Sequence, residues 1–304
     1  MLDRRRFYMT TMAIAVAQMF GPLSRVNAAN NAQGGELPGD LRRLTEPGGG
    51  DNRATYMPDG RTLLLASKRS GRSQIWEINA DGTEPRQFHP SATNDYGRVT
   101  VNSDGSRICF SSDRDGQNAI YVLDVATGRT TLISDTAFWS FGPSWSTHDV
   151  IAYFSKKGGN ELNVWTVFPD GSGARQVTNQ PGQSRQPWWS PDGSTLVISA
   201  DRGTGAFEIF SLNPDGSDVR LITSDGSCTQ PFWRPDGKMI AISARIQEPR
   251  YRIFIMATDG SMLRPIHQPE MGDNVHPAWS PDGSRIVFTA GKDSKSSLYE
   301  FHMV

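Results

Sequence analysis

A phrase of five residues that ends in Asp-Gly recurs along this chain and constrains its fold more than any other feature. The aspartates of its copies are separated by about 44 residues or by twice that spacing, and residues 41–304 hold six such repeats. A period of this length is typical of solenoids and propellers. The clear copies are residues 56–60, 101–105, 189–193, 233–237 and 279–283, and residues 145–148 are a degenerate copy.

Every repeat carries the same order of strand and turn signals. After the Asp-Gly turn comes a short run of β-branched and apolar residues such as 196–199, then a polar turn, a second run such as 119–123, another glycine turn and a third run. These runs are too short for helices and are typical of strands. The pattern predicts an all-β fold, a six-bladed β-propeller of four-stranded antiparallel blades.

The two ends of the array predict how the ring closes. The last repeat stops after its third strand, over residues 297–304, and has no fourth. Residues 41–48 resemble the fourth-strand segment of an inner repeat, residues 174–182. We therefore expect an amino-terminal strand to complete the last blade, which avoids an unpaired strand edge.

The repeat resembles that of the TolB-like propeller family, whose PD40 repeats are related to WD40 repeats. The resemblance rests on residues 186–193 (Gln-Pro-Trp-Trp-Ser-Pro-Asp-Gly) and 276–283 (His-Pro-Ala-Trp-Ser-Pro-Asp-Gly), and it extends over residues 41–304. It implies a periplasmic protein that uses its propeller to bind a cell-envelope protein or peptide, as in Tol-Pal-type envelope integrity or transport. TolB itself has an α/β domain ahead of its propeller, whereas residues 29–40 precede the propeller here, so we expect a TolB-like relative rather than TolB.

The amino terminus predicts export. Residues 1–28 combine three arginines, an apolar stretch of twelve residues and small residues around Ala28, which is the pattern of a cleaved signal peptide. Arg4, Arg5 and Phe7 match the twin-arginine type, and a Sec signal is the alternative. We expect a periplasmic protein with no transmembrane segment in the mature chain, in which residues 29–40 form a flexible lead-in and 41–304 the propeller.

Charge and cysteine content exclude several classes of partner and site. The net charge of -1 gives no reason to expect nucleic acid as a partner. Cys109 and Cys228 are expected to be free thiols, because positions three blades apart cannot approach within disulfide distance. The repeated aspartates are expected to hold their own turns, and the repeated tryptophans to pack between blades.

The repeat also predicts where a ligand would bind. Six residues before each turn aspartate, or before His148 in the degenerate copy, the chain enters the innermost strand at one mouth of the axial channel. Because arginine pairs with carboxylates through two parallel hydrogen bonds, we expect this mouth to prefer an acidic peptide or a uronate. The alternative is a set of ordinary solvated loop residues. The residues at this position are Arg53, Arg98, Gly142, Gln186, Gln230 and His276. Further candidates, which we expect to be exposed, lie just upstream: Asp51, Asn52, Asp95, Tyr96, Trp139, Arg185, Asp273 and Asn274.

Two functions are consistent with this mouth. The first is a non-enzymatic binding scaffold without a cofactor, in which Arg53 and Arg98 could be replaced with little effect on the melting temperature. The alternative is a polysaccharide lyase acting on an acidic oligosaccharide. Oligogalacturonate lyases resemble this propeller and hold a divalent metal with three histidines and a glutamine, for which this mouth offers only Gln186, Gln230 and His276.

Overall fold

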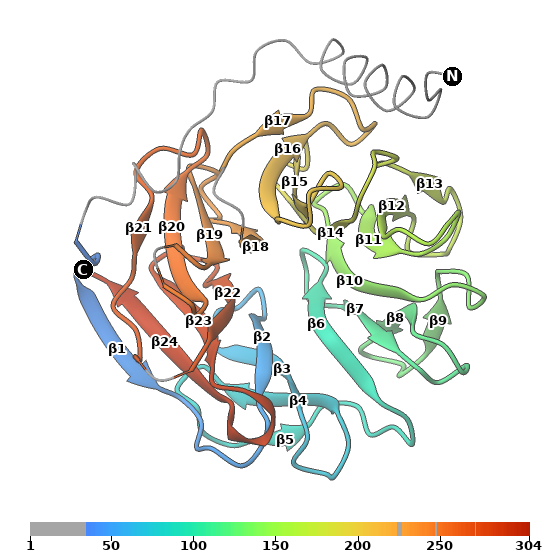
Figure 1. Cartoon of the computed structure of the whole chain (residues 1–304). Coiled ribbons are helices and arrows are strands. Elements are labelled where there is room, and N and C mark those ends of the chain that lie inside the picture. The colour runs from blue at the N-terminus through green and yellow to red at the C-terminus, as the bar shows by residue number, and fades with distance from the viewer. Residues whose placement is uncertain (1–34, 224–226, 247, 271) are drawn as a thin grey trace, which may run out of the picture.

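The computed structural model describes residues 35–223, 227–246, 248–270 and 272–304, which form six four-stranded antiparallel sheets arranged around an axis (Figure 1). The six-bladed propeller expected from the repeat is confirmed. The predicted signal peptide, residues 1–28, and residues 29–34 lie outside the described part of the chain. Within that part, no helix is long and apolar enough to cross a membrane.

The blades follow one another in chain order, and each sheet except the last is a four-stranded meander. Blade 1 contains β2 (Asn52–Tyr56), β3 (Thr62–Ser67), β4 (Gln74–Asn79) and β5 (Arg86–Gln87). Blade 2 contains β6 (Asp95–Val101), β7 (Arg107–Ser112), β8 (Ala119–Asp124) and β9 (Thr130–Leu132). Blade 3 contains β10 (Ser140–Trp145), β11 (Ile151–Ser155), β12 (Asn163–Val167) and β13 (Arg175–Gln176).

The remaining blades repeat this plan. Blade 4 contains β14 (Ser184–Trp189), β15 (Leu196–Ala200), β16 (Glu208–Leu212) and β17 (Arg220–Leu221). Blade 5 contains β18 (Cys228–Trp233), β19 (Met239–Ala244), β20 (Arg252–Ala257) and β21 (Arg264–Pro265). Blade 6 contains β22 (Asn274–Trp279), β23 (Arg285–Ala290), the 3-10 helix η1 (Asp293–Lys295), β24 (Ser297–Met303) and β1 (Gly39–Arg43).

An amino-terminal strand closes the ring, as expected. β1 pairs antiparallel with β24, from Gly39 opposite Met303 to Arg43 opposite Tyr299. Contact with the propeller begins before residue 41, however, because the Leu37 backbone amide donates to the Pro265 carbonyl of blade 5 at 2.8 Å. Residues 35–40, which we expected in the flexible lead-in, are therefore attached to the propeller.

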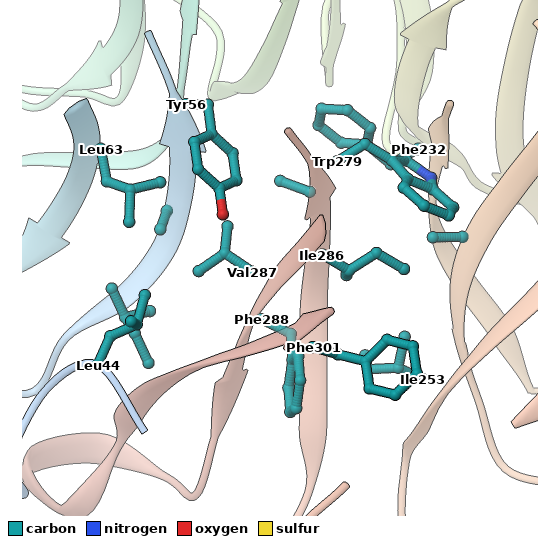
Figure 2. Packing of buried hydrophobic residues seen from close by; sticks show 14 of the residues in the cluster. Leu44, Tyr56, Leu63, Phe232, Ile253, Trp279, Ile286, Val287, Phe288 and Phe301 are labelled. Carbon is teal, nitrogen blue, oxygen red and sulfur yellow. The ribbon is translucent and has the colours of Figure 1, made fainter. Parts of the chain in front are cut away.

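The repeated aromatic residues pack between blades, as predicted. Tyr56, Trp189, Trp233 and Trp279 are at most 9% exposed. The Tyr56 hydroxyl from blade 1 donates to Glu300 of blade 6 at 2.6 Å. Figure 2 shows Tyr56 in the same apolar cluster as Val287 and Phe301 of blade 6. Contacts of this kind join each blade to the next.

The repeated aspartates hold their turns. Asp59, Asp104, Asp192, Asp236 and Asp282 each accept a hydrogen bond from the backbone amide two residues later. Hydrogen bonds from Ser280 and Ser284 lower the pKa of Asp282 to about 2. Both cysteines are free and buried. These residues therefore serve the fold, as the repeat predicts.

Candidate functional site

The innermost strand of each blade contains a bulge at the end where the chain enters it. In β14, for example, Arg185 pairs with Ser199 and Trp188 with Val197, so one residue is extra. The extra residue has a positive φ of 54° to 62° at Arg53, Gly142, Gln186, Gln230 and His276. Non-glycine residues rarely adopt this conformation, which costs roughly 1–2 kcal/mol each, and such strain is often found at functional sites.

Blade 2 departs from this pattern. Between the Tyr96–Ser111 and Thr100–Cys109 pairs, β6 has two extra residues instead of one. Gly97 takes the left-handed position with a φ of 87°, and Arg98 follows it. Counting back from the turn aspartate therefore finds Arg98 but assigns it to the wrong position in the bulge.

All six predicted mouth residues line one cavity on the propeller axis. The cavity measures about 50 Å³, and its remaining walls are aromatic rings and prolines. Among the described residues, no aspartate or glutamate lines it. The innermost strands that supply these residues surround the centre of the ring in Figure 1. The lining residues are Arg53, Arg98, Phe141, Gly142, Pro143, Phe154, Gln186, Pro187, Trp188, Gln230, Pro231 and His276.

Arg98 reaches across the axis instead of lying at an open mouth. Its Nη2 donates to the Pro277 carbonyl of blade 6 at 2.9 Å. Its guanidinium carbon lies 5.2 Å from the ring centre of Trp188 and 5.0 Å from that of Phe232. Arg98 is only 9% exposed. Burial, and then the charge of Arg53, lower its pKa to about 9.

Arg53 is the second cation of the cavity. Its Nη1 donates to Asn52 Oδ1 at 3.0 Å, and its guanidinium lies 5.8 Å from the ring centre of Phe141. Burial lowers the pKa of Arg53. Of the residues that the structure describes, no carboxylate forms a salt bridge with Arg53 or Arg98. Two positive charges, Arg98 buried and Arg53 half-buried, thus face one small cavity without a counter-ion among the described residues.

The two glutamines connect neighbouring blades through their side-chain oxygens. The backbone N–H of Gln230 donates to Gln186 Oε1 at 3.1 Å, and the backbone N–H of His276 donates to Gln230 Oε1 at 2.8 Å. These bonds satisfy backbone amides that the bulges leave unpaired. Only the Nε2 groups of the glutamines are then available as donors toward a ligand.

His276 adds a buried ring nitrogen. Its Nδ1 is buried and has no hydrogen-bond partner among the described residues. Burial, and then the charges of Arg53 and Arg98, hold the pKa of His276 well below its usual value of 6.5. The imidazole is therefore neutral near pH 7.

A wider vestibule lies outside the cavity. It measures about 640 Å³ and shares Arg53, Phe141 and His276 with the inner cavity. Its other side chains include two aromatic and four charged residues, namely Tyr96, Tyr251, Lys68, Asp273, Lys292 and Asp293.

Several upstream candidates are not free for a ligand. Asp51 is buried and pairs with Arg69 at 2.5 Å, and Asp95 is buried and pairs with Arg114 at 2.8 Å. Asn274 is fully buried, and its side chain donates to Pro269. The Arg185 guanidinium stacks on Phe207 at 3.5 Å. Our expectation that these residues are exposed is therefore wrong for Asp51, Asp95 and Asn274, because the fold uses them.

The aromatic walls of the cavity were not predicted from the sequence. Phe141, Phe154, Trp188 and Phe232 surround the cations, and the Trp188 and Phe232 ring centres lie 4.0 Å apart. In three repeats, an apolar or aromatic residue lies two positions after the left-handed residue of the bulge, and this signal was available in the sequence. These residues are Trp188, Phe232 and Ala278.

The donor set does not fit the metal expected under the lyase alternative. His276 is the one histidine that lines the cavity, and no group of three histidine, cysteine or acidic residues within the described ranges could hold a metal ion. Two arginines beside the same cavity would also repel a divalent cation.

The chain belongs to the TolB beta propeller domain family, which matches residues 37–172 and 98–302. A TolB homologue of Chlorobium luteolum is 28% identical over 154 residues, which are 51% of this chain and 34% of that protein. The chain thus matches about a third of that relative's length.

Solved structures share the fold at low sequence identity. TolB from Acinetobacter baumannii is 19% identical with a TM-score of 0.63, over 88% of this chain and 65% of that one. An oligogalacturonate lyase in complex with manganese is 18% identical with a TM-score of 0.61, over 88% and 94%. Both likenesses concern the fold alone.

Proposed function

We propose that this protein is an exported binding scaffold, located in the periplasm, whose axial cavity holds a carboxylate group of a cell-envelope protein or peptide. The family membership and the signal-peptide pattern of residues 1–28 support the location and the class of partner. The geometry of the cavity supports the chemistry.

One observation carries the proposal. Arg53 and Arg98 converge on a cavity that no acidic side chain of the described residues lines. Burying cations without a counter-ion is costly, so an anionic group that enters the cavity gains their full attraction. The Nε2 groups of Gln186 and Gln230 add neutral donors, and the aromatic walls exclude water and strengthen each interaction.

Acetate tests this chemistry in its simplest form. We expect acetate to bind the purified protein in a calorimetric or NMR titration, and the neutral isostere acetamide not to bind. Arg53→Gln should weaken acetate binding at least tenfold. Arg185→Gln is the matched control, because Arg185 stacks on Phe207 at the same end of the ring but lines neither cavity. Equal binding of acetate and acetamide, or an unchanged affinity in Arg53→Gln, would contradict the proposal.

A further inference from the structure

The inner cavity is small compared with the vestibule that leads to it. A volume of about 50 Å³ has room for roughly three to five water-sized groups. A carboxylate with its attached carbon fills such a space, whereas a pyranose ring with its hydroxyl groups does not. A larger ligand must therefore keep its body in the vestibule of about 640 Å³ and place only an anionic tip inside.

The junction between the two spaces limits how a ligand enters. Arg53, Phe141 and His276 line both the cavity and the vestibule, so a ligand that enters from the vestibule passes these three side chains to reach Arg98. An internal acidic side chain would have to bring two continuing chain segments to this junction. The end of a chain brings only one.

The donors around the cavity match a single carboxylate. An ionised carboxylate has about four acceptor sites. The side chains of Arg53, Arg98, Gln186, Gln230 and His276 line this space from five blades, and the two guanidinium groups and the two glutamine Nε2 groups are the donors that they offer to a carboxylate.

We infer that the anionic group is the terminal carboxylate of an extended polypeptide, which enters the vestibule end first and places its carboxylate between Arg53 and Arg98. This inference rests on the proposed function and narrows its ligand. The last few residues of the partner then lie in the vestibule, between Tyr96 and Phe141 on blades 2 and 3 and the lysines Lys68 and Lys292 on blades 1 and 6.

Three synthetic peptides test the inference by calorimetric titration. The first is Ac-Ala-Tyr-Ala-Ala with a free carboxylate, the second is its carboxy-terminal amide, and the third is the amide Ac-Ala-Asp-Tyr-Ala-NH2, whose only carboxylate is internal. We expect the free acid to bind at least tenfold more tightly than either amide. Arg53→Gln should abolish that preference, and Arg185→Gln should keep it.

The other outcomes separate this inference from the proposed function. If the internal-aspartate amide binds as tightly as the free acid, the cavity takes carboxylates but not chain ends, and the inference is overturned alone. If acetate binds and no peptide does, it is also overturned alone. If inorganic phosphate displaces the free acid at equal concentration, the site prefers phosphate to the terminal carboxylate, and the inference is overturned. If neither acetate nor any peptide binds, both the inference and the proposed function are overturned.

Discussion

Arg98 is a buried cation that we expect to contribute little to the stability of its own fold. It has one hydrogen bond to a carbonyl and two aromatic neighbours, but no carboxylate partner among the described residues. Its pKa is lowered mainly because burial removes the charged guanidinium from water, which is unfavourable for the charged form. Such a residue is expected where a binding site is maintained at the expense of stability.

Replacing Arg98 with an apolar residue of similar length should therefore stabilise the protein. We expect Arg98→Met to raise the free energy of unfolding by about 1 kcal/mol, because relief of the unpaired charge exceeds the loss of the Pro277 hydrogen bond. Thermal unfolding should show the gain, while acetate binding falls at least tenfold. A lower melting temperature would contradict this account. The structure thus revises the expectation that Arg98 is neutral for stability.

His276 should couple ligand binding to proton uptake. Burial, and then the charges of Arg53 and Arg98, keep it neutral in the free protein, and a bound carboxylate would raise its pKa again. The other charged groups near its end of the strand are Lys68, Asp273, Lys292 and Asp293 of the vestibule. We expect acetate affinity to increase as pH falls below about 6.5.

The measurement is calorimetry in buffers of different ionisation enthalpy. Wild type should take up a fraction of a proton on binding. His276→Gln should take up less, and this variant suits the backbone because glutamine occupies the same left-handed position in blades 4 and 5. In the absence of ligand, the unfolded chain binds a proton at His276 more readily than the folded protein does, because the pKa of His276 is lowered in the folded state. The free energy of unfolding should therefore decrease as pH falls below 6.5. Equal proton uptake in both proteins would rule out His276 as the coupled group.

At the scale of single elements, the bulge in β6 decides where Arg98 lies. Gly97 has a φ of 87°, and a Cβ there would lie 3.1 Å from the Phe141 ring and 3.2 Å from Ser111 Oγ. Gly97→Ala should therefore destabilise the protein by more than the roughly 1–2 kcal/mol of a left-handed alanine. Gly116→Ala is the control, since Gly116 has a φ of 97° but nothing within 4 Å of the added carbon. Equal losses in chemical denaturation would show that β6 tolerates the added group.

The same elements explain which features of the structure could be predicted from the sequence and which could not. The blades, closure by β1 and the six mouth residues of the cavity could be predicted, because each repeats at a fixed spacing and a ring brings equivalent positions together. The extra residue of β6 could not, since counting from Asp104 gives the same number with or without it. Contacts such as Arg98 with Pro277 join blades 2 and 6 and do not repeat, so no periodic signal reports them.

At the scale of the whole molecule, the propeller has two different ends. The cavity and vestibule lie where the innermost strands begin. Because the strands of a blade alternate in direction, the turn between β12 and β13 lies at the opposite end, and it carries Phe168, a large apolar side chain that is 48% exposed. A partner could contact either end, and the cavity lined by Arg53 and Arg98 lies at the first.

Site-specific photo-crosslinking in living cells tests most directly whether a partner binds at the cavity end. Tyr96→p-benzoylphenylalanine places the probe in the vestibule, and Phe168→p-benzoylphenylalanine places it at the opposite end. We predict a crosslinked partner from position 96 that is lost when Arg53→Gln is added and when excess free-acid peptide competes. A partner captured from position 168 alone, or one captured from position 96 regardless of Arg53, would contradict the account.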